Sequence, residues 1–156
     1  MRFLLRATIG LLLIGLISAC KQKVANEIHS PVSPTAFRTD IPPIQSRLPK
    51  LLGITKCYWQ GTLIGADARA PGPSLEQVKG FIFLNNNEAM RIHEHYPWHA
   101  SAVGWRPALD TSILGITPTK WLNSNEYASA IKLSFQQHVV VYFDPDHSLL
   151  YIEIER

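Results

Sequence analysis

The sequence predicts an α+β fold, a small single domain in which one or two short helices pack on an antiparallel sheet that ends in a C-terminal hairpin. Two observations carry this prediction. The apolar runs between residues 51 and 156 are short and are bounded by Gly, Pro and Asn, which is typical of strands mixed with short helices. The last of these runs alternates apolar and polar side chains after a turn sequence. The 106 residues from 51 to 156 are enough for one hydrophobic core but not for two.

The C-terminal hairpin is the clearest element. "VVVYF" precedes "DPDH", and "LLYIEIE" follows it. In the last run Leu150, Ile152 and Ile154 occupy every second position, which is the period of a half-buried strand. The turn sequence combines a proline, which presets φ, with aspartates that bond to nearby backbone amides. The apolar face of the last strand needs a covering layer, and the segment before the hairpin can supply one.

That preceding segment has two interpretations. Asn123 and Glu126 have the spacing of a capping box and predict a helix through "SNEYASAIKLSFQ". Ile131, Leu133 and Phe135 nevertheless alternate with polar residues, which is the pattern of a strand. The helix is the preferred interpretation, and helix and strand both stay open for residues 131–137.

Two strands are expected further upstream. "ITKCYWQGTLIG" predicts an early strand with Gly61 as a candidate bulge. Ser74 and Gln77 have the spacing of a cap and predict a single helical turn that Gly80 ends. A buried strand, "FIFL", follows this turn.

Three histidines lie close together after that strand. Asn85 to Asn87 open either a turn or a helix that runs to His95, since Pro97 cannot continue a helix. In "RIHEHYPWHA", His93, His95 and His99 lie within seven residues, and three imidazoles can hold zinc while leaving a position for water. The stretch lacks the His-Glu-x-x-His arrangement of zinc proteases, and its spacing fits neither a helix nor a strand. Exposed or stacked histidines are therefore preferred, with a zinc-binding or metal-dependent hydrolytic site as the alternative.

The same stretch is rich in aromatic side chains. Tyr96, Trp98 and Trp105 lie within ten residues, and Arg91 and Arg106 flank them. Exposed rings would make a protein contact or a sugar-stacking platform, and the arginines would pair with anionic groups of the partner. Buried rings would form the core of a small domain, which is the more common place for them.

Residues 20–50 are expected to form a tether, and residues 51–156 the globular domain. Residues 21–50 hold five of the eleven prolines and few large apolar side chains. Such a composition buries too little surface to offset the entropy lost on ordering. We therefore expect a flexible segment between residue 20 and the domain.

Residues 1–19 have the pattern of a secretory signal peptide. Arg2 and Arg6 precede an uncharged run from Ala7 to Ala19 that is too short to cross a membrane. The end of this run, Ile17-Ser18-Ala19-Cys20, resembles the lipobox of bacterial lipoprotein precursors. The resemblance covers the signal segment only.

This resemblance implies a lipid anchor. It implies that the chain is cut before Cys20, that the Cys20 thiol carries diacylglycerol as a thioether, and that the new amino terminus is acylated. Two or three acyl chains hold a protein firmly in a bilayer. Lys21 stands where an aspartate retains such proteins at the inner membrane, which implies the outer membrane, with the domain facing the periplasm.

Composition narrows the remaining options. Without Arg2 and Arg6 the chain has 13 Lys and Arg against 12 Asp and Glu and no basic cluster, so nucleic acid is not an expected partner. If Cys20 is lipidated, Cys57 has no intramolecular partner. A buried core thiol is then preferred for Cys57, with an intermolecular disulfide or a catalytic nucleophile as alternatives.

The sequence shows no motif of a common enzyme class. It has no Gly-x-Ser-x-Gly elbow, phosphate-binding loop, paired-cysteine knuckle or dinucleotide fingerprint, so no cofactor is expected apart from the zinc alternative. The expected function is that of a lipid-anchored envelope lipoprotein, a non-enzymatic module that binds an envelope or incoming protein. The alternatives are the zinc site and a peptidoglycan- or glycan-binding module.

Overall fold

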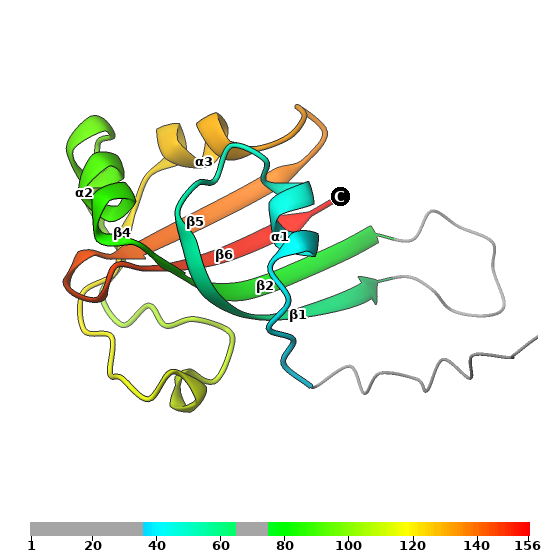
Figure 1. Cartoon of the computed structure of the whole chain (residues 1–156), viewed down its shortest axis with the longest axis horizontal. Helices are drawn as coiled ribbons and strands as arrows, with labels where there is room; N and C mark the ends of the chain where they lie inside the picture. Colours follow the sequence, from blue (N-terminus) through cyan, green and yellow to red (C-terminus); the bar gives the residue numbers. More distant parts are fainter. Residues whose placement is uncertain (1–35, 65–74) are drawn as a thin grey trace, which may run out of the picture. The chain divides into compact units, whose positions relative to one another are not determined.

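The sheet is the centre of the computed structural model, which describes residues 36–64 and 75–156. Six strands pair in the order β1-β2-β6-β5-β4-β3, and every neighbouring pair is antiparallel (Figure 1). The strands are β1 (Ile54–Ile64), β2 (Leu75–Leu84), β3 (His99–Ala100), β4 (Leu122–Asn123), β5 (His138–Asp144) and β6 (Leu149–Glu155). The helices are α1 (Pro42–Arg47), α2 (Asn86–His95) and α3 (Asn125–Ile131), with two short 3-10 turns, η1 (Thr111–Leu114) and η2 (Pro145–His147). The predicted α+β class and antiparallel sheet are confirmed.

Both faces of the sheet are covered, because side chains alternate along each strand. On one face Cys57, Ile82, Leu150 and Phe143 are cross-strand neighbours, and the three helices pack over them (Figure 1). The helices contribute buried apolar side chains to this helical face, namely Ile44, Ala89, Ile92, Tyr127, Ala128 and Ile131. On the other face Tyr58, Phe81, Tyr151 and Tyr142 are neighbours, and residues 101–121 lie over them. We call residues 101–121 the cover segment.

The C-terminal hairpin forms as predicted, with η2 as its turn. Leu150, Ile152 and Ile154 are buried on the helical face, as their spacing predicts. The strand is nevertheless buried on both sides over most of its length, since Leu149 and Tyr151 are also fully buried. The cover segment buries this second side, which the alternating pattern alone does not reveal.

Strands β1 and β2 correct two predictions. Gly61 pairs in register with Val78, so it is not a bulge, and the register shift lies between Ile54 and Lys56. Gly80 does not end a helical turn, because β2 runs straight through it and places it opposite Trp59. A Cβ at Gly80 would lie 2.8 Å from the Trp59 Cβ, so the position requires a glycine. Ser74, the other end of the predicted turn, lies outside the described residues.

The helices α2 and α3 begin at side-chain caps. The Asn85 side chain accepts a 2.8 Å hydrogen bond from the Glu88 amide, and α2 ends at His95 before Pro97, as predicted. At α3 the cap is Ser124, which accepts from the Tyr127 amide at 3.2 Å, and not the predicted Asn123. The helix ends at Ile131, and residues 132–137 are neither helix nor strand.

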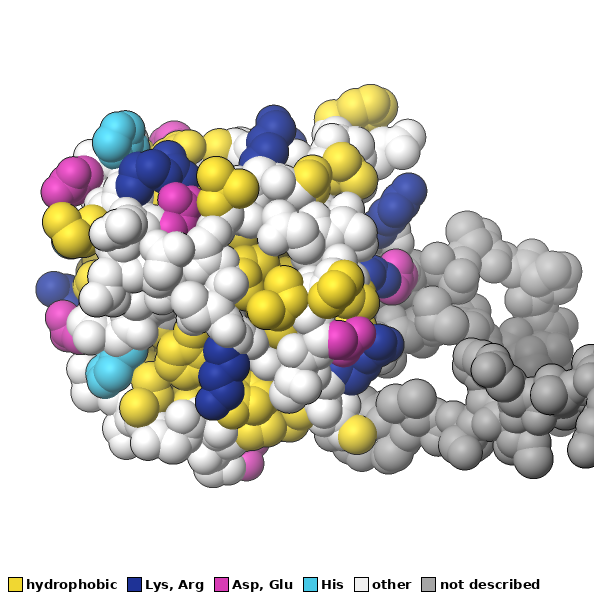
Figure 2. All heavy atoms as spheres, in the orientation of Figure 1, with side chains coloured by type: hydrophobic (Ala, Val, Ile, Leu, Met, Phe, Trp, Pro, Cys, Tyr) yellow, Lys and Arg dark blue, Asp and Glu magenta, His cyan; other side chains and the backbone are white. Residues whose placement is uncertain are grey.

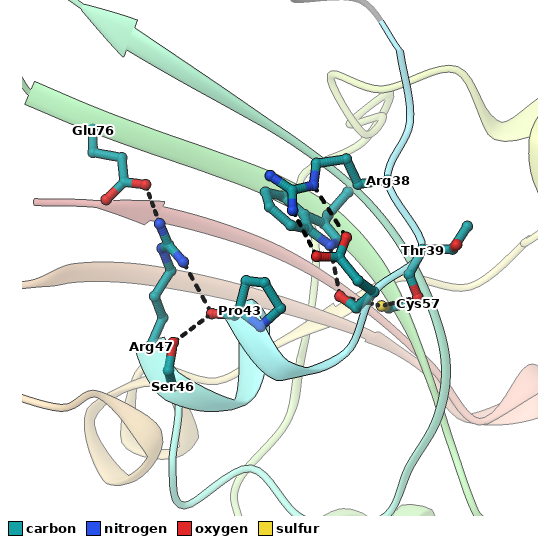
Figure 3. A network of polar contacts seen from close by, with 9 residues as sticks. Arg38, Thr39, Pro43, Ser46, Arg47, Cys57 and Glu76 are labelled. Atoms are coloured by element: carbon teal, nitrogen blue, oxygen red, sulfur yellow. Dashed lines mark hydrogen bonds and ion pairs between the residues drawn. The ribbon is translucent and has the colours of Figure 1, made fainter. Parts of the chain in front are cut away.

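The helix α1 lies inside the segment that the sequence predicts as a tether. Ile44 and Leu48 are fully buried in the helical face, and the Arg47 guanidinium pairs with Glu76 and donates to the Pro43 carbonyl (Figure 3). The predicted domain boundary at residue 51 is therefore too late. Ile44 and Leu48 lie one helical turn apart, and their burial offsets the entropy lost when this segment is ordered. The proline content alone did not indicate this burial. The signal peptide, Cys20 and residues 21–35 of the tether lie outside the described residues.

Candidate binding surface

The cover segment is fixed to the sheet by aromatic packing. Trp105 stacks on Tyr142 with ring centres 3.6 Å apart and an interplanar angle of 23°. Trp121 meets the edge of Trp105 at 5.6 Å, and both rings approach Tyr151. The Ala108 amide donates a 3.2 Å hydrogen bond to the Tyr151 hydroxyl, which in turn donates to Glu153. These contacts hold an otherwise irregular chain in one place.

Local turns shape the outer side of the cover segment. The Trp105 amide bonds to the Ala102 carbonyl at 3.0 Å, which closes a turn around Val103 and Gly104. The Asp110 carboxylate accepts from the amide and the hydroxyl of Ser112 at the start of η1, and these bonds lower the pKa of Asp110. The turn closed by Ala102 and Trp105 leaves the Val103 side chain fully exposed.

This outer side presents apolar, aromatic and basic groups together. Val103 and Arg106 are exposed on either side of the half-buried Trp105. Arg106 forms no ion pair with any described residue. Nearby on β1, the Lys56 ammonium lies 4.7 Å from the Tyr58 ring centre and 5.7 Å from that of Phe83. Figure 2 shows hydrophobic side chains gathered between the cover segment and strands β1 and β2, with a basic side chain over them. Such a surface can contact a protein through apolar area and bind an anionic group.

Trp98 and Tyr96 do not belong to this surface. The two rings pack against Tyr127 with centres 5.5 and 4.9 Å away, and Trp98 also packs against Phe143. The indole nitrogen of Trp98 donates to the Ile92 carbonyl at 2.9 Å. Trp98 therefore lies on the helical face and Trp105 on the opposite face, so the two do not form one stacking platform.

Arg91 is engaged within its own helix. Its guanidinium makes a two-pronged contact with the Glu88 carboxylate, at 2.8 and 2.7 Å, and this pairing raises the pKa of Arg91. The Glu88 side chain is nearly buried, so the pair satisfies a carboxylate that would otherwise be costly to bury. Of the two arginines predicted for partner contact, only Arg106 is without an ion pair in the described part of the chain.

The three predicted histidine ligands point to different surroundings. His93 and His95 lie two residues apart on α2, which directs them to different sides of the helix, and His99 lies on β3. His93 packs near Phe143, and the His95 Nδ1 hydrogen donates to the Arg91 carbonyl at 2.8 Å. Within residues 36–64 and 75–156 no group of three His, Cys, Asp or Glu side chains could hold a metal ion.

Cys57 is a core residue, as preferred. Its side chain is fully buried on the helical face, and the thiol contacts the carbonyl oxygens of Thr39 and Asp40 at 3.4 and 3.6 Å (Figure 3). Burial, reinforced by the Asp40 charge, raises the pKa of the thiol. A thiol in this state is a poor nucleophile.

Hydrogen bonds to the Asp144 side chain close the hairpin turn. Asp144 is fully buried and accepts from the Asp146 amide at 3.1 Å and from the His147 Nδ1 at 2.9 Å. These bonds lie within the turn, which agrees with the prediction that the aspartates of this sequence stabilise the turn.

Sequence reasoning missed two exposed sites, Val103 and the pair Leu133 and Phe135. For the pair, alternation was the available signal, but it indicates a strand as the alternative to the preferred helix and does not indicate an exposed loop. For Val103, a lone apolar residue beside a glycine gives no distinctive pattern.

Comparisons with known proteins find no match for the chain. It matches no protein-family model, and searches of the curated proteins and of the solved structures find no match either. No helix in the described ranges has both the length and the apolar character needed to cross a membrane.

Proposed function

We propose that this protein is a lipid-anchored lipoprotein of the bacterial envelope whose domain binds another protein without catalysis. The anchor is Cys20, and the preferred location is the outer membrane, with the domain facing the periplasm. The segment Ile17-Ser18-Ala19-Cys20, after a basic start and a short apolar run, supports the anchor.

The observation that carries the binding role is the outer side of the cover segment. There the exposed Val103 and Arg106 flank Trp105, which packing against Tyr142 holds rigid. Tryptophan and arginine are the side chains that most often dominate protein contacts, and a rigid aromatic ring loses little entropy on binding. We assign the partner contact to this surface and not to Trp98, which packs half-buried against Tyr127 and Phe143.

The anchor is tested first. Cells that express the full chain are fed radiolabelled palmitate, and the membrane fraction is compared between wild type and Cys20→Ser. We expect label and membrane retention in the wild type and loss of both in the variant. Equal retention without label would remove the lipid anchor from the proposal.

The binding role is tested by photo-crosslinking in cells from the full-length protein. A photoreactive residue replaces Val103, and the matched control replaces Ser129, which is exposed on α3. We expect a discrete protein adduct from position 103, lost when Arg106→Glu is added, and none from position 129. An adduct-free result at position 103, in cells where the protein is folded and membrane-bound, would contradict the binding role.

A further inference from the structure

Strand register defines one end of the sheet. His138, Glu155, Gln77 and Thr62 form a row across β5, β6, β2 and β1. The chain between α3 and β5 enters this row directly at His138. We call this the anchor end of the sheet, because residues 36–38, which precede the sheet and follow Cys20 in the chain, run toward it.

The first described residues of the chain, 36–38, also run toward this end. Arg38 pairs with Trp59 in antiparallel orientation, through backbone hydrogen bonds of 2.8 and 2.9 Å. Moving back from Arg38 to Ala36, the chain therefore runs in the direction from Trp59 toward Thr62. Residues 36–38 thus run from the middle of β1 toward the end of the sheet where residues 132–137 lie.

Residues 132–137 are held in a defined shape by a buried side chain. Gln137 is 5 % exposed, and its Oε1 accepts from the Leu133 amide at 2.8 Å. Its Nε2 donates to the Arg47 carbonyl at 3.3 Å, and its own amide donates to the Ser134 carbonyl at 3.2 Å. Gln137 thereby fixes the loop to α1 and closes its turn.

The fixed loop presents two large apolar side chains to the outside. Leu133 is 53 % exposed and Phe135 is 86 % exposed. Figure 2 shows hydrophobic side chains protruding where Figure 1 draws the chain between α3 and β5. Single exposed apolar residues are ordinary, but here a buried glutamine holds two of them on one loop.

The charges at the anchor end suit a lipid surface. Lys132 precedes the apolar pair and forms no ion pair with any described residue. Among the described acidic side chains at this end, Glu76 is paired with Arg47, and Glu155 accepts a 2.7 Å hydrogen bond from Gln77. A lysine beside apolar side chains that enter a bilayer can extend its ammonium to anionic headgroups.

We propose that residues 132–137 contact the bilayer in which Cys20 is anchored, with Leu133 and Phe135 entering the boundary between headgroups and acyl chains. The inference rests on the proposed anchor. The 16 residue steps from Cys20 to Ala36 span at most about 55 Å when fully extended. The bilayer is thus always within reach at high effective concentration, which favours it over a free protein as the occupant. The cover segment, which lies toward the hairpin-turn end of the sheet, then faces away from the membrane.

The test uses the full mature lipoprotein in vesicles of phosphatidylethanolamine and phosphatidylglycerol. An environment-sensitive fluorophore is attached to Phe135→Cys, and the matched control is Val103→Cys, an exposed apolar position on the cover segment. We expect spin-labelled lipids to quench the probe at position 135 at least twofold and to leave the probe at position 103 unchanged. Replacing Leu133 with Ser should weaken the quenching, because one of the two inserted side chains is lost.

Two results would overturn the inference. One is a protein retained by its lipid, according to palmitate label and vesicle flotation, whose probe at position 135 is not quenched. The other is a blue shift without lipid quenching, which would assign the loop to contact between copies of the chain. A protein that carries no lipid fails the proposed function itself, so the palmitate label distinguishes the two failures.

Discussion

The indole nitrogen of Trp59 donates a hydrogen bond of 2.9 Å to the carbonyl oxygen of Asp40, which joins edge strand β1 to the segment before α1. The Arg38 guanidinium lies 4.2 Å from the Trp59 ring centre and pairs with the Asp40 carboxylate at 2.6 Å (Figure 3). The hydrogen bond from Arg38 lowers the pKa of Asp40. The segment from Arg38 to α1 is therefore part of the folded domain.

Truncating Leu48 should destabilise the domain strongly. The side chain is fully buried on the helical face, so Leu48→Ala removes apolar contacts and leaves a cavity that costs about 2–5 kcal/mol. The matched control is Leu52→Ala, because Leu52 is 56 % exposed and its loss should change the free energy of unfolding by less than about 0.5 kcal/mol. Urea unfolding measures both variants. Equal stability of the two would mean that α1 does not belong to the core.

Gly80 should not tolerate alanine, whereas Gly61 should. A Cβ at Gly80 would lie 2.8 Å from the Trp59 Cβ and 3.1 Å from the Tyr58 carbonyl oxygen, and neither can easily move. At Gly61 the nearest atom would be 3.4 Å away, which is ordinary contact. We expect Gly80→Ala to lower the free energy of unfolding by about 1–3 kcal/mol and Gly61→Ala to be near neutral or stabilising. Thermal unfolding of both variants checks this, and a neutral Gly80→Ala would contradict the close approach.

Two buried tyrosines should respond oppositely to loss of their hydroxyl groups. The Tyr127 hydroxyl is buried without a hydrogen-bond partner among the described residues, so Tyr127→Phe should be neutral or stabilising. The Tyr151 hydroxyl accepts from Ala108 and donates to Glu153, so Tyr151→Phe should cost about 1 kcal/mol or more. Chemical denaturation gives both values, and a destabilised Tyr127→Phe would reveal a partner for that hydroxyl.

The same tyrosines should make the domain sensitive to alkali. Burial raises the pKa of Tyr127 and of Tyr151 in the folded state above the value of about 10 in an unfolded chain. Above pH 10 the folded state therefore binds more protons than the unfolded state, and the free energy of unfolding falls as pH rises. Below pH 10 this contribution is fully present. Unfolding at pH 9 and pH 11 should show a smaller loss in Tyr127→Phe than in the wild type, and an identical loss would exclude Tyr127 as a source.

Sequence periodicity predicted the parts of the fold whose cause is local. The hairpin follows from alternation around Asp144 and Pro145, and the end of α2 follows from Pro97. The errors arose where distant residues decide the outcome. Gly80 has the sequence context of a helix end, but its position is determined by the contact with Trp59 across the sheet. The sequence of α1 is typical of a proline-rich linker, but Ile44 and Leu48 pack in the core.

For the candidate binding residues, too, the errors arose where contacts distant in the sequence decide the outcome. The sequence placed Trp98 and Trp105 together because they are close in the chain. Between them, however, β3 ends and the cover segment crosses to the other face of the sheet. The sequence alone does not show this crossing. It also left Arg91 and Arg106 equivalent, whereas the position of Glu88 one helical turn from Arg91 separates them.

Cys57 should be unreactive in the folded protein. The thiol is buried against the Thr39 and Asp40 carbonyls, and burial raises its pKa, so little thiolate forms near neutral pH. We expect a thiol reagent at pH 7.5 to modify Cys57 only as fast as the 38–41 segment leaves the edge of β1. Trp59→Phe deletes the hydrogen bond to Asp40 and should increase the modification rate, whereas Trp121→Phe, on the opposite face, serves as the control.

The number of thiols that react after denaturation tests the anchor independently. A thioether at Cys20 would leave one reactive thiol per mature chain, and an unmodified Cys20 would give two. Cys57 is free and buried, so a fast-reacting thiol in the folded protein that peptide mapping assigns to Cys20 would contradict its lipidation. Rapid modification of Cys57 itself, identified by peptide mapping, would instead show that α1 and its preceding segment open readily.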